Sequence, residues 1–173
     1  MLLKRPQHAA RIAAIAAQWT QVEDLMAELL AAAFGSSTKT DDGAHSVSMN
    51  WIASSAIREA ETIRVRLKIM DATLGSVLRS RASPLLSEWQ QLKLELGKRG
   101  RERNEVVHGR WLLTPEYPND LVMERREGGY LKYTVEDLDD ILDRAVSAWR
   151  RCHSFQIAVL DAKLEGPEFP GSV

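Results

Sequence analysis

The chain has 173 residues, of which 45% are hydrophobic and 27% are charged, with a formal net charge of −1. These values are typical of a globular protein with one sizeable core, and they exclude the strongly basic field of many nucleic-acid-binding domains. The single cysteine, Cys152, excludes an intramolecular disulfide, and no apolar stretch approaches membrane-spanning length, so we expect a cytoplasmic protein with no membrane contact.

The first half of the chain predicts two long helices joined by a polar loop. We expect the first from about Gln7 to Phe34, because apolar residues recur three and four positions apart. These are Ile12, Ile15, Trp19, Val22, Met26, Leu29 and Ala33. Residues 35–43 are rich in Gly, Ser, Thr and Asp, which predicts a loop. We expect the second helix from about Ser48 to Leu74. Its apolar stripe consists of Ile52, Ala56, Ile63, Leu67, Met70 and Leu74.

A third helix is expected to begin at Ser83 and Pro84, residue types common at the N-cap and at the first helical position. Its buried stripe has helical spacing. This stripe consists of Leu85, Trp89, Leu92 and Leu96. The same phase continues to Arg103 and then to Val106 or Val107. Since an unpaired buried charge is strongly unfavourable, Arg103 should face a carboxylate, a cleft open to water or a second subunit.

Polar and basic side chains gather at the end of this third helix. From Lys93 to Arg110 there are six basic residues against three acidic ones. Asn104 and His108 are four positions apart, so they share a helix face, and Arg103 would border the same region unless a glycine kinked the helix. This patch permits RNA binding at one cleft, whereas the alternative is an ordinary solvated face of mixed charge.

The chain after Gly109 predicts a small β insertion, over about 111–134, and then a fourth helix. We expect an extended segment from Trp111, strands over 120–126 and 130–134 joined around a Gly-Gly turn, and a capping box at Thr134 and Asp137 before a helix over about 135–162. Its inward residues are Leu138, Leu142, Ala145, Trp149, Cys152 and Val159. The fold is therefore predicted to be mainly α, with one domain over 1–163 and a flexible tail over 164–173.

Other chemical sites have little support in the sequence. The four histidines lack the spacing of metal ligands, and Cys152 and His153 are adjacent on a helix, so their side chains point apart. Aspartates at the start of the fourth helix are best interpreted as charge favourable to a helix N-terminus. The five tryptophans are interpreted as core or interface anchors. We therefore predict no metal and no cofactor.

The third helix ends in the run Arg103-Asn104-Glu105-Val106-Val107-His108, followed by Gly109-Arg110-Trp111. This run resembles the R-x4-6-H signature of the HEPN superfamily, and its continuation is similar to bacterial HEPN-like proteins. The rest of the chain resembles that family only in its architecture of long antiparallel helices. The resemblance implies a HEPN-like bundle of four long helices and a homodimer in which two motifs line one cleft, and the residues predict a small β-hairpin inserted between helices 3 and 4. The hairpin departs from a minimal HEPN domain.

The resemblance also implies a function, because many HEPN proteins are metal-independent endoribonucleases of toxin–antitoxin or phage-defence systems. His108 would then be the acid/base, Arg103 the phosphate contact and Asn104 the residue that orients them, in keeping with their side-chain chemistry. Arg99, Arg101 and Arg110 would be further RNA contacts. The implied partners are a second copy of the chain, an RNA substrate and an antitoxin protein.

One alternative function stays open from the sequence. The chain would then be a non-catalytic HEPN-like helical interaction module that binds a partner protein. In that case, Arg103 and His108 would be a structural pair at the helix end.

Overall fold

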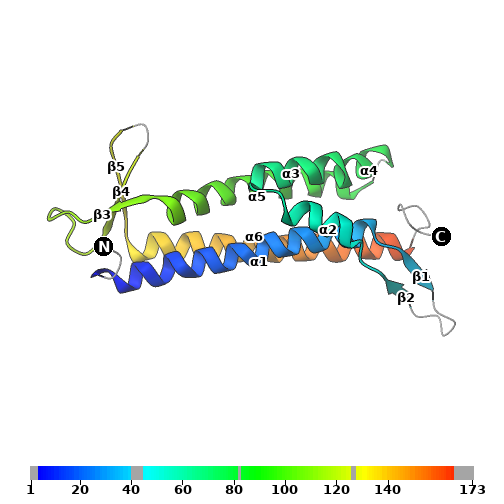
Figure 1. Ribbon diagram of the computed structural model, residues 1–173, viewed down its shortest axis with the longest axis horizontal. Helices are drawn as coiled ribbons and strands as arrows, with labels where there is room; N and C mark the ends of the chain where they lie inside the picture. Colours follow the sequence, from blue (N-terminus) through cyan, green and yellow to red (C-terminus); the bar gives the residue numbers. More distant parts are fainter. Residues whose placement is uncertain (1–3, 40–44, 82, 126–127, 166–173) are drawn as a thin grey trace. The chain divides into compact units, whose positions relative to one another are not determined.

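The computed structural model describes residues 4–39, 45–81, 83–125 and 128–165, and it confirms a mainly helical chain (Figure 1). The helices are α1 (Pro6–Phe34), α2 (Trp51–Arg58), α3 (Ile63–Ala72), α4 (Leu74–Ser80), α5 (Leu85–His108) and α6 (Val135–Glu165). The strands are β1 (Ser37–Lys39), β2 (His45–Val47), β3 (Arg110–Leu112), β4 (Leu121–Glu124) and β5 (Tyr130–Tyr133). None of the described helices is both long and apolar enough to cross a membrane.

The chain divides into two compact units. The first unit contains Met1–Gln21 and Lys98–Ser147, and the second contains Val22–Gly97 and Ala148–Val173. Helices α1, α5 and α6 contribute residues to both. The single domain expected over residues 1–163 stays a prediction. Helix α6 continues to Glu165, beyond its predicted end, and residues 166–173 of the predicted tail lie outside the described part of the chain.

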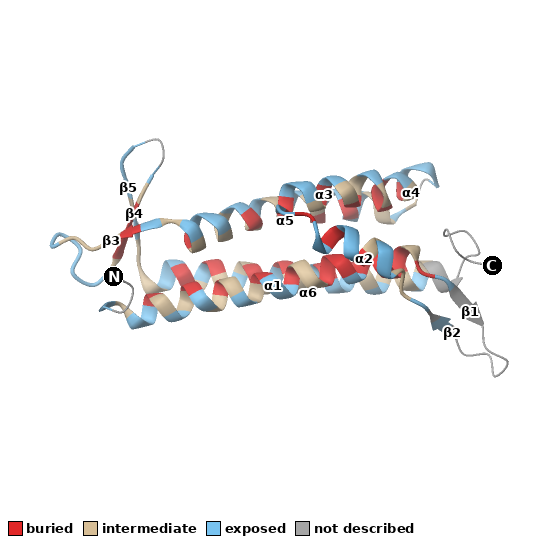
Figure 2. Ribbon diagram, viewed as in Figure 1, coloured by how far each residue is buried: buried red, intermediate tan, exposed pale blue. Residues whose placement is uncertain are grey.

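The second long helix, predicted over 48–74, is wrong as one element, because the segment forms α2, α3 and α4. The backbone of Thr62 is extended and its side-chain oxygen accepts a hydrogen bond from the Val65 N–H at 3.3 Å, which starts α3 anew. The predicted stripe is wrong in α2, where Ile52 is 84% exposed and Ile57 is buried instead. It is confirmed in α3 and α4, where buried residues lie along one side (Figure 2).

The loop predicted over residues 35–43 contains part of a short hairpin. Strand β1 pairs with β2 in antiparallel register, with Ser37 opposite Val47, and residues 40–44 lie outside the described chain. A Cβ atom at Gly35 would collide with the Ser48 carbonyl, so the close approach of the two chain segments requires glycine there. Periodicity alone did not indicate this pairing, because both strands are only three residues long.

A network around Asp71 joins four helices of the second unit. The Asp71 Oδ1 atom accepts a hydrogen bond from the Trp89 indole at 3.0 Å and pairs with Lys93 at 3.1 Å and with Arg79 at 3.3 Å. The fully buried Trp89 ring stacks on Phe155 of α6, with ring centroids 6.0 Å apart. Partial burial raises the pKa of Asp71, but the bonds from Trp89, Lys93 and Arg79 outweigh it, so the net pKa lies below its ordinary value.

The core of the first unit lies where α1, α5 and α6 meet a three-stranded antiparallel sheet of order β3-β4-β5. Its buried residues are Ile12, Ile15, Val106, Trp111, Leu121, Met123, Leu138 and Ile141. The predicted hairpin is confirmed, with Gly128 and Gly129 at φ of 87° and 85° in the turn, and β3 adds a strand to it. The capping box is confirmed, since Thr134 and Asp137 each accept the other's backbone N–H, at 3.1 and 2.8 Å.

Asp71→Asn tests the network of the second unit. Because folding lowers the pKa of Asp71, its stabilisation is fully present above the ordinary value of 3.8 and is lost as the pH falls through the lower folded-state pKa. We expect the substitution to lower the free energy of unfolding at neutral pH by about 1–2 kcal/mol and to weaken its acid dependence. Urea unfolding over a pH series measures both effects. The control is Asp161→Asn, an exposed carboxylate of α6, and equal losses in the two variants would contradict the network.

Candidate functional site

The end of α5 is held against the sheet by its own continuation into β3. Helix α5 runs unbroken through Gly97 and Gly100 to His108. The indole N–H of Trp111, which is 7% exposed, donates a hydrogen bond to the Val106 carbonyl at 3.1 Å. This bond satisfies one of the carbonyls that a helix leaves unpaired at its C-terminus. The position of the motif is therefore set by a buried contact.

Gly109 allows β4 to approach the helix end closely. A Cβ atom at this position would collide with the Met123 side chain of β4 and would lie 2.6 Å from the Glu105 carbonyl oxygen. The second of these neighbours is backbone of α5 and has little freedom to move. Glycine at this position thus lets the sheet pack directly beside the motif.

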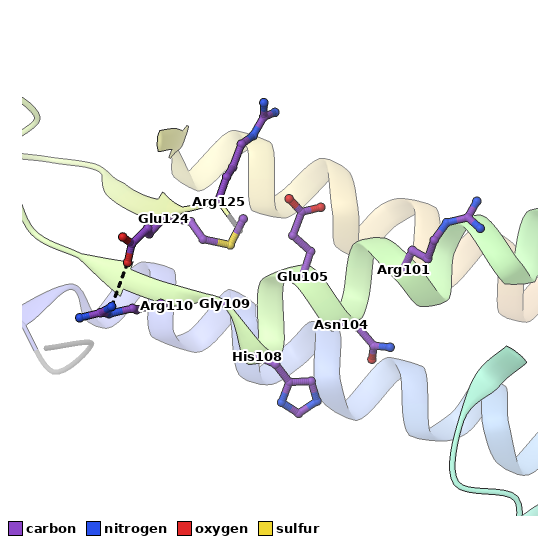
Figure 3. A pocket seen from close by; sticks show the side chains of 9 residues that line it. Arg101, Asn104, Glu105, His108, Gly109, Arg110, Glu124 and Arg125 are labelled. Carbon is purple, nitrogen blue, oxygen red and sulfur yellow. Dashed lines mark ion pairs between the residues drawn. The ribbon is translucent and has the colours of Figure 1, made fainter. Parts of the chain in front are cut away.

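The structure brings the three predicted catalytic residues together. An Nη1 atom of Arg103 donates to Asn104 Oδ1 at 2.9 Å and lies 3.2 Å from His108 Nε2. Arginine can only donate, so His108 Nε2 is the acceptor in this contact. His108 and Asn104 are exposed and lie on the same side of α5 (Figure 3).

Arg103 has a different partner from the carboxylate that the sequence analysis considered. Among the described residues, no carboxylate pairs with its guanidinium, and its contacts are the amide and imidazole of its own helix. Its Nε atom is buried without a hydrogen-bond partner in the described chain. The guanidinium therefore has one N–H donor without an acceptor, in addition to its contacts with the amide of Asn104 and the imidazole of His108.

A cleft of about 740 Å³ opens at this end of α5. It is lined by residues of α5, of β4 and of the segments that follow each of them (Figure 3). The lining residues are Arg101, Asn104, Glu105, His108, Gly109, Arg110, Met123, Glu124 and Arg125. The predicted acid/base and orienting residues therefore border an open, mixed-charge cleft.

The three predicted RNA contacts differ in how they are engaged. Arg99 binds both carboxylate oxygens of Glu102, at 2.7 and 2.8 Å, and its side chain is only 16% exposed. Arg110 lines the cleft but pairs with Glu124 across β3 and β4, at 3.1 Å. Arg101 lines the cleft and is exposed, with no ion pair among the described residues.

Sequence reasoning missed Arg125, which lines the cleft from the end of β4. It is 22 positions from Arg103 in the sequence, and only the pairing of β4 with β3 brings it to the motif. The signal available was the Gly-Gly turn, which places the adjoining strand ends beside each other. That signal does not say which helix end the hairpin packs against.

A second hollow shares Glu105 with the cleft. Its lining includes Tyr133, Asp137, Asp140 and Arg144, along with Glu105 itself. Burial, with a further contribution from the Glu105 charge, raises the pKa of Tyr133 to about 12. The Tyr133 hydroxyl therefore stays protonated at neutral pH and is no candidate for a nucleophile or base there.

Two further chemistries lack a site in the described chain. No group of three His, Cys, Asp or Glu side chains there is arranged to hold a metal ion. Cys152 is buried, and its burial raises its thiol pKa to about 12, so it remains an unreactive thiol at neutral pH.

Comparisons with protein-family models, curated proteins and solved structures find no match to this chain.

Trp111→Phe tests whether the indole fixes the end of α5. Phenylalanine keeps an aromatic ring but removes the N–H donor, which leaves the Val106 carbonyl without this bond in a buried place. We expect the free energy of unfolding, measured by urea denaturation, to fall by about 1–3 kcal/mol. The control is Trp51→Phe, because Trp51 is 71% exposed. If both variants unfolded at the wild-type urea concentration, the Trp111 bond would carry no stability.

Proposed function

We propose that this protein is a HEPN-like, metal-independent endoribonuclease of a toxin–antitoxin or phage-defence system. The observation that carries the proposal is the contact of Arg103 with Asn104 and His108 at the edge of an open cleft. A fixed cation, a titratable imidazole and an amide at one helix end are the groups that phosphodiester transfer needs. The active form would be a homodimer whose two motifs face each other, and an antitoxin protein would restrain it.

His108 moves the protons in this proposal. Its Nε2 atom takes the proton from a ribose 2′-OH as that oxygen bonds to the adjacent phosphorus. The bond from phosphorus to the 5′-oxygen then breaks, and this oxygen receives a proton from the His108 of the second copy, which acts as an imidazolium and ends as the neutral imidazole. The products are a 2′,3′-cyclic phosphate and a 5′-hydroxyl, and no metal takes part.

Arg103 changes partners in this scheme. In the free protein its guanidinium occupies the lone pair of His108 Nε2, so the imidazole cannot yet act as a base. A phosphate offers Arg103 a charged, bidentate acceptor, which is stronger than a neutral imidazole or amide. Substrate binding would thus draw Arg103 from His108 and release Nε2 for the ribose. Asn104 would hold the guanidinium during this exchange.

Cleavage of a labelled structured RNA in the presence of EDTA tests the function. We expect wild-type protein to cleave it and to leave a 2′,3′-cyclic phosphate end. His108→Ala and Arg103→Ala should each reduce the rate by about 10²-fold or more, because one removes the acid/base and the other the phosphate contact. The measurement is the rate of product formation on a denaturing gel.

Matched controls separate the motif from general effects of lost charge. His153→Ala removes an exposed histidine of α6, and Arg150→Ala removes an exposed arginine of the same helix that has no ion pair in the described chain. Both should cleave at the wild-type rate. Cleavage that survived in the His108 and Arg103 variants would indicate a contaminating nuclease and refute the proposal.

The alternative function, a non-catalytic interaction module, is favoured by one observation. The first turn of α2 carries Trp51 and Ile52 with 71% and 84% of their surface exposed. Large apolar side chains exposed side by side are common where a protein binds a partner. Under this alternative, the contact between Arg103 and His108 would be a structural feature of the helix end.

The stability of His108→Ala distinguishes these two functions. A structural histidine costs about 1 kcal/mol or more when its hydrogen bond is lost. An exposed histidine kept for chemistry costs little, and we expect the free energy of unfolding to change by less than about 0.5 kcal/mol. Urea denaturation of the variant beside wild type measures the difference. A loss above 1 kcal/mol together with inactive wild-type protein would favour the interaction module.

A further inference from the structure

The arginines at the cleft differ in whether a carboxylate already neutralises them. Arg110 forms a cross-strand ion pair with Glu124, at 3.1 Å. Arg99 is bound by Glu102 and does not line the cleft. Arg101 and Arg125 line the cleft, are exposed and have no ion pair among the residues that the structure describes. These two are the cations that remain available to an anion.

Arg101 and Arg125 come from different elements that are each held in place. Arg101 lies on α5, two positions before Arg103. Arg125 directly follows β4, and its backbone N–H donates to the Gly129 carbonyl at 3.0 Å while its carbonyl accepts from Gly128 at 3.2 Å. Since β4 packs against Gly109, the Arg125 backbone has a set position relative to the motif (Figure 3).

The carboxylates of the cleft restrict where an anion can bind. Glu105 has no ion pair in the described chain and lines the cleft together with Glu124. These charges repel a polyanion from the middle of the lining, so phosphates are favoured only near the free arginines and near Arg103. A ligand that satisfies this pattern carries negative charges at intervals along a flexible chain.

We propose that Arg101 and Arg125 bind backbone phosphates of an unpaired RNA strand whose scissile phosphate Arg103 contacts. This inference rests on the proposed endoribonuclease function and extends it. The strand is unpaired because a rigid duplex holds its riboses in one geometry, whereas transfer needs the 2′-OH to align with phosphorus. The sheet inserted after α5 then supplies one wall of the substrate cleft.

Binding of a fluorescein-labelled, 2′-O-methyl oligouridylate measures these contacts without cleavage, because this probe has no 2′-OH nucleophile. We expect Arg101→Ala and Arg125→Ala each to weaken binding about fivefold, as for an exposed ion pair. Each should also reduce the slope of log K against log salt concentration by about 0.7, the value for one phosphate contact of a single strand. Arg150→Ala is the matched control and should bind as wild type.

One variant is expected to raise the affinity for the probe, whereas the arginine variants lower it. Glu124→Gln removes a negative charge from the cleft and frees Arg110 from its ion pair, so we expect tighter binding and a steeper salt slope. Simple loss of folding cannot produce this result.

The outcomes separate this inference from the proposed function. Reduced affinity in the Arg101 and Arg125 variants supports the inference even if wild-type protein does not cleave RNA, which would refute the endoribonuclease alone. Wild-type affinity in both variants, with cleavage intact, would overturn the inference and leave the endoribonuclease standing. A wild-type protein that does not bind the probe would overturn the inference.

Discussion

The hydrogen bond from the Trp111 indole to the Val106 carbonyl is the constraint on which the candidate site depends. It ends α5 one residue before Gly109, where the chain turns into β3. Glycine at that turn lets Met123 of β4 pack against the helix end, where a Cβ atom would collide. Helix end and sheet therefore form one buried junction. This junction fixes the positions of both the motif and Arg125.

Partial neutralisation explains how a chain of net charge −1 can present cations at one cleft. The Arg99–Glu102 pair is mostly buried and is joined by Arg144, so opening it would leave charges without solvent. The Arg110–Glu124 pair is different, because the arginine side chain is 78% exposed. An exposed pair contributes at most about 1 kcal/mol and weakens with salt. Arg110 can therefore leave its ion pair to bind an anion, whereas Arg99 stays in its pair and has a structural role.

Local patterns predicted the elements well where one short-range interaction decides them. The Thr134–Asp137 capping box and the Gly128–Gly129 turn each depend on residues a few positions apart, and both are confirmed. The break before α3 was missed, because the apolar spacing continues across residues 59–62, where α2 ends and the Thr62 cap starts α3. Arg125 was missed for another reason: its place beside the motif results from strand pairing and from packing at Gly109, which act over long sequence separations. Whether four helices form the arrangement of the HEPN bundle stays a prediction.

The contact between Arg103 and His108 has a consequence for either function. It links the guanidinium to an amide and an imidazole, and a second donor of the same group, Nε, is buried without a partner in the described chain. A phosphate carries negative charge and can accept two parallel hydrogen bonds from a guanidinium, which the Asn104 amide cannot do. An anion that reaches Arg103 therefore competes with the present contacts of this side chain, whichever of the two functions applies.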